Sequence, residues 1–140
     1  MSSSLELDAE VRHDLEELVD RGVAAIVAAL ETAAHELRET HIPAEAPRGA
    51  TGHLASDWHE REHDPLTRVV FPGPEAWYAH IVAYGRAAVR PVGSKALTIG
   101  EEYRAWAGPA TPDPFHERAI AATEQGADRM LDDALAAQGI

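Results

Sequence analysis

The longest regular pattern in this sequence is an apolar stripe that begins at Val11 and ends at Leu37. Its members recur at three- and four-residue steps, the spacing that places side chains on one face of an α-helix. The pattern predicts one long amphipathic helix, beside which the rest of the chain must fold. The stripe consists of Val11, Leu15, Leu18, Val19, Val23, Ile26, Val27, Leu30, Ala34 and Leu37.

Both ends of this helix have local signals. Ser3 followed three residues later by Glu6 has the form of a capping box, so we expect the helix to begin near Leu5. Ile42 precedes Pro43, and the residue before a proline is disfavoured in helical conformation. The helix is therefore expected to end around Thr40, within an N-terminal helical region 1–41, and a linker is expected over 42–52.

The length of the predicted helix constrains the whole fold. At 1.5 Å per residue it would extend roughly 50 Å, whereas a compact 140-residue globule is about 35 to 40 Å across. The helix must then either bend, with Gly22 as the expected place, or project beyond its own domain. A projecting stripe that includes Val11, Leu15 and Leu18 would need a partner, and these three residues are our predicted oligomer interface.

The pattern changes after the linker, where short runs rich in valine, threonine and aromatic residues alternate with turn residues. We expect strands near Ser56–Glu62, Leu66–Phe71, Lys95–Ile99 and Tyr103–Ala107. The segment between Pro74 and Gly85 is expected to be a short helix, with a strand as the alternative.

A second long helix is expected to open with Asp113 as N-cap and Pro114 at the first helical position. The predicted fold class is α+β: a small antiparallel sheet packed by the long N-terminal helix and this C-terminal helix. We expect one domain over 1–140, with the sheet in 53–111 and the last helix in 112–140. The predicted buried stripe of that helix is Phe115, Ala119, Ala122, Ala127, Met130, Leu131 and Ala134.

Composition excludes several classes of function. The 24 acidic and 12 basic residues give a formal charge of −12, which repels phosphate backbones and argues against a dedicated nucleic-acid binder. Because cysteine is absent, the chain has no disulfide framework, thiolate zinc site or thiol nucleophile. The apolar run Gly22 to Leu30 is about half of the roughly 20 residues that a membrane span requires. The acidic N-terminus lacks the pattern of an export signal, so we expect the protein to stay in the cell that makes it.

The segment His59 to His63 reads H-E-R-E-H and matches the H-E-x-x-H core of zinc metalloproteases. That motif works on a helix, where two histidines four residues apart share a face and a glutamate serves as general base. Asp64-Pro65 disfavours a helix here, and the extension that supplies a third zinc ligand is absent. We expect a polar, surface-facing strand, with a small zinc-dependent hydrolase as the alternative.

No other constellation indicates a reaction. His53, His59, His63 and His80 are expected to be solvated surface residues, with a metal site as the alternative. The serines lie in no G-x-S-x-G context, and the glycines have no phosphate-binding spacing. We predict no catalytic residue, no cofactor and no resident metal. The tryptophans and tyrosines are expected in the core rather than in a ligand pocket; they are Trp58, Trp77, Trp106, Tyr78, Tyr84 and Tyr103.

Four segments of this sequence, taken in order, resemble the sequence pattern of a known protein family. They are A-P-R-G-A-T-G-H-L-A-S from Ala46, W-Y-A-H-I-V-A-Y-G from Trp77, R-P-V-G-S-K-A-L-T-I from Arg90, and Y-R-A-W-A-G-P-A-T-P-D-P-F from Tyr103. In this order they resemble the head-tail joining (tail-completion, neck or minor tail) proteins of long-tailed bacteriophages and prophages. That pattern has T-G-x-L, Y-A-x-x-V-E-x-G-T, an A-L strand and P-x-P-F; this chain departs from it at Ala83 and Arg86. The matching residues are Thr51, Gly52, Leu54, Tyr78, Ala79, Val82, Gly85, Pro114 and Phe115.

The resemblance implies a structural virion protein at the head-tail interface, assembled in the bacterial cytoplasm. It implies a ring of about six copies that contacts portal-side head-completion proteins and tail-tube-side proteins, with DNA only passing through. We expect the matching residues to be structural: Thr51 caps the following turn, Gly52 and Gly85 adopt positive φ, and Tyr78, Val82 and Phe115 anchor the core. A host-encoded acidic binding module is a further alternative.

Overall fold

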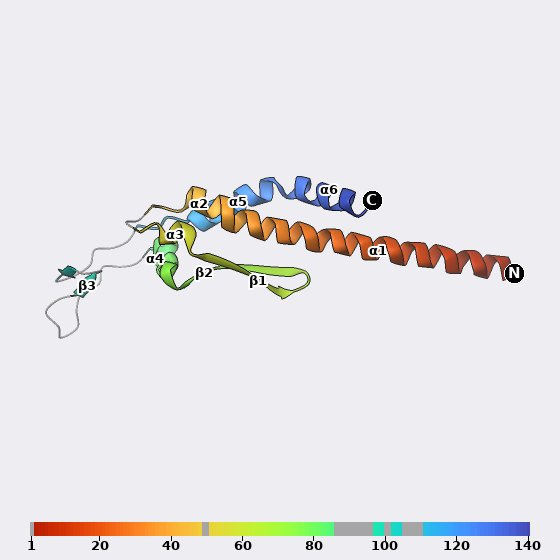
Figure 1. Ribbon diagram of the computed structural model, residues 1–140, viewed down its shortest axis with the longest axis horizontal. Coiled ribbons are helices and arrows are strands. Elements are labelled where there is room, and N and C mark those ends of the chain that lie inside the picture. Colours follow the sequence, from red (N-terminus) through yellow and green to blue (C-terminus); the bar gives the residue numbers. More distant parts are fainter. Residues whose placement is uncertain (1, 49–50, 86–96, 100–101, 105–110) are drawn as a thin grey trace.

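The structure is a computed structural model that describes residues 2–48, 51–85, 97–99, 102–104 and 111–140. One long helix dominates it, and a smaller body lies at the C-terminal end of that helix (Figure 1). One antiparallel hairpin and several short helices make up this body, together with two C-terminal helices, and a second antiparallel pair of strands occurs later in the chain than the first. The α+β fold class expected from the sequence is therefore confirmed.

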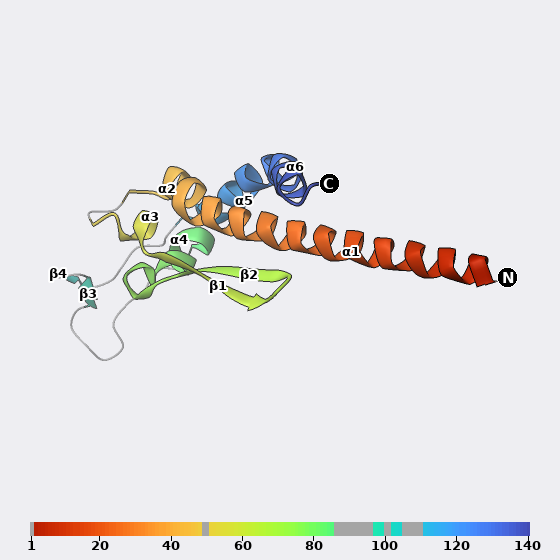
Figure 2. The ribbon, with the colours of Figure 1, turned by 45° about the vertical axis from the view of Figure 1, so that its right-hand side comes forward.

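Helix α1 spans Ser2–Glu36 and is straight in both views (Figures 1 and 2). It does not bend at Gly22, which lies inside the helix with open space where a Cβ would be. Ser3 also lies inside the helix, so the capping-box prediction for its start is wrong. Of the two arrangements that the sequence allowed, the structure has the projecting one.

The expected helix end at Thr40 is also wrong. A π-helical turn, Leu37–His41, follows α1 and leads into helix α2, Ile42–Glu45. Pro43 occupies the first turn of α2, where its missing N–H has no intrahelical partner to lose. Helical backbone therefore continues through the proline and into the expected linker.

Two C-terminal helices, α5 (Phe115–Gln125) and α6 (Ala127–Ala137), run back alongside α1 (Figures 1 and 2). Arg129 of α6 bonds Glu36 at 3.1 Å, and a Cβ on Gly139 would lie 4.0 Å from the Arg21 guanidinium. Helix α6 therefore ends beside Arg21. The part of α1 before Arg21 extends beyond this contact.

The C-terminal helical region differs from the prediction at two points. It is two helices divided at Gly126 rather than one. Pro114, not Asp113, holds the cap position of α5, and no side chain caps that helix. The Asp113 carboxylate instead accepts a hydrogen bond from Arg118 at 2.6 Å.

Strands β1 (Trp58–Asp64) and β2 (Thr67–Pro72) form an antiparallel hairpin in which Trp58 is opposite Pro72. This hairpin confirms the first two predicted strands to within two residues. Strands β3 (Leu97–Ile99) and β4 (Glu102–Arg104) form a second antiparallel pair. The remainder of those two predicted strands, 95–96 and 105–107, lies outside the described residues. Among the described residues, the strands form two separate two-stranded sheets rather than one small sheet.

Short helices connect these strands. Helix α3 (His53–Ser56), which was not predicted, precedes β1. A 3-10 turn at Pro74–Ala76 and helix α4 (Ala79–Tyr84) follow β2, so the helical alternative for this segment is correct. Gly85 ends α4 with a φ of +76°, a conformation that glycine adopts at little cost.

The hydrophobic core lies where α2, α3, β1, α4 and α5 meet. Phe115 and Ile42 are its largest fully buried side chains, and Trp58 packs edge-on against Phe115. Trp77 and Tyr84 contradict the expectation that the aromatic residues are buried, because they are 65% and 68% exposed. The other core members are Ala46, Leu54, Ala79, Ala83 and Ala119.

Candidate functional site

Helix α1 has a continuous, exposed apolar face that begins in its projecting part and reaches the segment beside α6. Six large apolar side chains on α1 are 44% to 62% exposed. Single exposed apolar residues are ordinary, but a row of six on one helix is the kind of patch that marks an interaction site. We call this row the open stripe; it consists of Val11, Leu15, Leu18, Val19, Val23 and Ile26.

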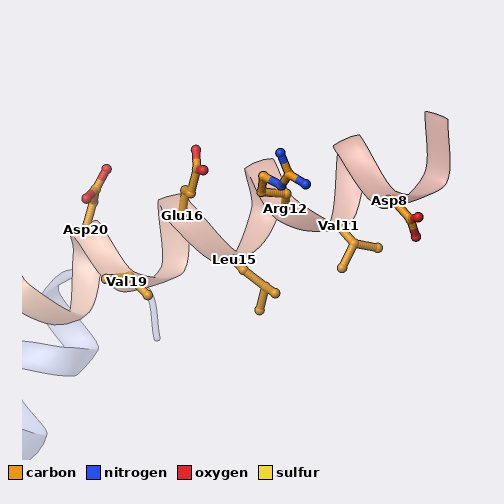
Figure 3. Close-up of a pocket in the computed structure, with 7 residues that line it drawn as sticks. All are labelled: Asp8, Val11, Arg12, Leu15, Glu16, Val19 and Asp20. Atoms are coloured by element: carbon orange, nitrogen blue, oxygen red, sulfur yellow. The ribbon is translucent and has the colours of Figure 1, made fainter. Parts of the chain in front are cut away.

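Figure 3 shows the outer end of this stripe. Val11, Leu15 and Val19 project to one side of the helix, and the charged groups of Arg12, Glu16 and Asp20 project to the other. All these residues belong to one helix, so they form an open face rather than an enclosed cavity. The predicted interface residues Val11, Leu15 and Leu18 are thus exposed, and the sequence analysis omitted Val19 from the interface although it is the most exposed member.

The charge around the open stripe is strongly negative. We define the tip as residues 8–20 of α1, which carry six carboxylates and one arginine. One carboxylate, Glu17, lies 3.3 Å from the ring of His13. Two tips that paired with each other would bring like charges together, which opposes such pairing.

A second apolar surface is hollowed into the body. It lies between the C-terminal half of α1, strand β2 and helix α5, and we call it the body groove. Alanines at positions 33 and 34 of α1 leave space along one wall because their side chains are small. The groove continues toward Trp58 and Phe115, past Leu37 and Val70. Its main apolar lining is Leu30, Ala33, Ala34, Val69, Val70 and Ile120.

Arg68 of β2 lines the body groove and is incompletely paired. Its side chain is only 19% exposed, and its Nε is buried without a hydrogen-bond partner. The nearest carboxylate oxygens, from Glu31 and Glu60, lie 4.0 Å from its terminal nitrogens. Buried guanidinium nitrogens in proteins usually have partners, so Arg68 is unusual in having only two long ion pairs at its terminal nitrogens.

The H-E-R-E-H segment lies in β1, which confirms the strand prediction. Four strand positions span about 13 Å, so His59 and His63 do not have the one-turn spacing of the helical motif. His59 instead pairs with Asp57 at 3.1 Å and stacks on Phe71. Glu60 is half-buried and bonds Arg38 at 3.4 Å. The segment therefore lacks the geometry on which the hydrolase alternative depends.

Three of the four histidines considered as a cluster have partners of their own, and that of His59 is Asp57. His53 pairs with Glu75 at 2.6 Å, and the His80 ring bonds the Trp77 carbonyl oxygen at 3.1 Å. Within the described part of the chain, no three histidine, aspartate or glutamate side chains are grouped so as to hold a metal ion.

Asp57 organises the turn that follows β2. Its carboxylate accepts a hydrogen bond from the backbone N–H of Glu75 at 2.6 Å, and its carbonyl oxygen accepts one from Gly73 at 2.7 Å. Desolvation raises the pKa of Asp57, but the bonds from Glu75 and His59 and the charge of His59 outweigh it, so the pKa is lowered. A Cβ at Gly73 would collide with this carboxylate, which explains a glycine there.

The first three residues that match the family pattern lie in α3 or immediately before it. Thr51 Oγ1 accepts a long hydrogen bond from the His53 backbone N–H at 3.4 Å, whereas the cap residue of α3 is Gly52 and no side chain caps that helix. Gly52 has a φ of +73°, and Leu54 is buried in the core.

The other six matching residues lie at α4 and the start of α5. Ala79 and Phe115 are buried, and Tyr78 and Val82 pack against the core. The carbonyl oxygen of Val82 accepts a hydrogen bond from the backbone of Asp113, which ties α4 to the approach of α5. The nine residues position backbone and core; none of them belongs to the open stripe. The two not yet mentioned here are Gly85, which ends α4, and Pro114, the cap residue of α5.

Comparison of the chain with protein-family models, curated proteins and solved structures finds no match. Among the described helices, none combines the length and the apolar character that crossing a bilayer requires.

The body groove is the main feature that the sequence analysis did not find. The sequence predicts β2 and places Leu30 and Ala34 of α1, with Leu37 of the π-helical turn, on the apolar stripe. It does not show directly that α1 and β2 remain partly uncovered. The run of alanines in α1 was an ambiguous signal for the groove, because alanines on an apolar face indicate either close packing against another element or a hollow.

Proposed function

We propose that this protein is a structural component of the head-tail interface of a long-tailed bacteriophage or prophage, where copies form part of a ring through which DNA passes. Its partners in this role are copies of itself, a portal-side head-completion protein and a tail-tube-side protein. The virion is its site of action, after assembly in the bacterial cytoplasm.

The observation that carries the proposal is the projecting α1 with its open stripe. A protein that acts alone gains nothing from exposing six large apolar side chains, whereas an assembly subunit buries them on meeting its neighbours. The ordered segments that resemble the neck proteins supply the kind of assembly. The nine matching residues lie in the core and turns of the body, which is consistent with a scaffold role.

Charge supports the same role. A formal charge of −12 discourages tight contact with DNA, so a wall built from this protein would let the polyanion slide. We expect no submicromolar binding to duplex DNA at about 0.15 M salt, measured by fluorescence anisotropy. Tight binding would favour a regulator that acts on nucleic acid.

The decisive experiment is an in-frame deletion of the gene in the phage or prophage that carries it. We expect DNA-filled heads and separate tails by electron microscopy, and joined virions again when the intact gene is supplied in trans. Normal joined virions from the deletion strain would refute the proposal and favour a host-encoded binding module.

A further inference from the structure

We infer that the tip of α1 from one copy docks in the body groove of the next copy. This inference names the contact that would join neighbouring subunits, so it rests on the proposed function, but its test does not require a virion. The occupant of the groove is a second copy of this chain.

The tip cannot fill the groove of its own chain. Val19 and Leu30 belong to the same straight helix, and eleven residues of helix separate them by about 16 Å. A second copy has no such constraint. The contact would be heterologous, since it joins two different surfaces, and such contacts generate rings or filaments.

The shapes of the two surfaces are complementary. The tip presents branched side chains at four-residue steps, Val11, Leu15 and Val19 (Figure 3). The groove has alanines at 33 and 34 and room between them and β2. Large side chains that enter a hollow between small ones bury apolar area without moving the backbone.

The charges favour this contact over pairing of two tips. The tip carries six carboxylates; those of Glu16 and Asp20 project away from its apolar side chains, and that of Asp8 projects to the same side as Val11 (Figure 3). The groove is lined by Arg68 and Glu124, and the terminal nitrogens of Arg68 have only long ion pairs, at 4.0 Å, with Glu31 and Glu60. Apart from Arg12 and His13, the charged side chains of the tip are carboxylates, so two tips side by side would repel each other, whereas the groove places one guanidinium near an incoming tip.

Because the chain has no cysteine, single cysteines report the contact cleanly. Val19→Cys marks the tip and Ile120→Cys marks the groove rim; these positions are 62% and 43% exposed, so both variants should fold. The two full-length proteins, one with a size tag, are mixed at high concentration and treated with a short bis-maleimide. We expect cross-linked heterodimers from the mixture, at least several-fold more than homodimers from either variant alone.

Two results would overturn the inference. Cross-linking of V19C only with itself would mean that tips pair with tips. Absence of any cross-link in the mixture, with both variants folded by circular dichroism, would mean that the groove does not take the tip. The control is a mixture of V19C with Glu117→Cys, a cysteine on the exposed face of α5 outside the groove. We expect no cross-linked heterodimer from this mixture, which measures cross-linking by random collision.

The role of Arg68 is tested in the same assay. We expect Arg68→Gln to lower the cross-linked fraction several-fold, and Arg61→Gln, on the exposed side of β1, to leave it unchanged. Equal cross-linking by both variants would show that charge does not direct the contact.

The experiments distinguish failure of the proposed function from failure of this inference. If the deletion strain makes normal virions while the V19C and I120C proteins still cross-link, the phage role is wrong and the contact stands. If virions need the gene but no cross-link forms, only the contact is wrong.

Discussion

The indole ring of Trp58 meets the ring of Phe115 edge to face, with centroids 6.1 Å apart. The indole N–H also donates a hydrogen bond to the Leu54 carbonyl oxygen at 2.6 Å. These contacts join α3, the start of β1 and the start of α5, which come from distant parts of the sequence. The body therefore depends on a few large side chains in one place.

We expect Phe115→Ala to lower the free energy of unfolding by about 3 to 5 kcal/mol, because it leaves a cavity where a fully buried ring was. Urea unfolding followed by circular dichroism measures the loss. Glu117→Ala, two residues later and exposed, is the control and should change stability by at most about 0.5 kcal/mol. Equal losses for the two variants would contradict the core described above.

Two glycines should respond in opposite directions to alanine. Gly22→Ala should stabilise the protein by roughly 0.5 to 1 kcal/mol, since Gly22 lies inside α1 with open space around its Cα. Gly52→Ala should destabilise it by about 1 to 2 kcal/mol, because a φ of +73° suits glycine but crowds a Cβ. Thermal melts of both variants and of the parent protein show whether each substitution raises or lowers stability. A stabilised Gly52→Ala variant would mean that the backbone at Gly52 is not left-handed.

Stability should depend on pH through Asp57. Because its pKa is lowered in the folded state, its contribution is present above the unfolded-state value of about 3.9 and is lost as pH falls through the folded-state value. Urea midpoints of the parent and of Asp57→Asn should differ at pH 6, and the difference should shrink below about pH 4. Glu62→Gln, exposed on β1, controls for general charge effects. A difference that stays constant across this range would show that ionised Asp57 does not support the turn.

Chelation of metal should leave the protein unchanged. His59 and His63 lie on a strand, and His59 is already paired with Asp57. We expect no stoichiometric zinc in untagged protein, and the same melting temperature with and without EDTA. One zinc per chain, lost in His59→Ala together with a hydrolytic activity, would support the hydrolase alternative instead.

The long helix and the first hairpin were predictable because both rest on periodicity over many residues. Projection followed from arithmetic on helix length, although the choice between a bend and projection did not. Gly22 costs too little inside a helix to bend it when nothing packs nearby.

The predictions that proved wrong rested on single residues, which were used to set helix boundaries or to assign burial. The sequence predicts a helix end before Pro43, but the π-helical turn before it places the proline in the first turn of α2, where it is tolerated. Gly126 divides the C-terminal helices, whereas the apolar stripe was drawn across it. Trp77 and Tyr84 were expected in the core by residue type alone, and residue type does not say which face of a short helix is outward.

The two parts of the straight helix α1 should differ in how well their amide hydrogens are protected from exchange with solvent. Between Arg21 and Glu36 it packs on α6, so its amide hydrogens should exchange with solvent only when the body opens. The tip has no tertiary support and retains its backbone hydrogen bonds through local helix propensity alone, which is marginal for a segment of that length in water. Its amides should exchange orders of magnitude faster than those a few turns along the same helix. A gradient of hydrogen exchange along α1 would therefore act as a built-in reporter, because any partner that covers the tip must slow exchange there first.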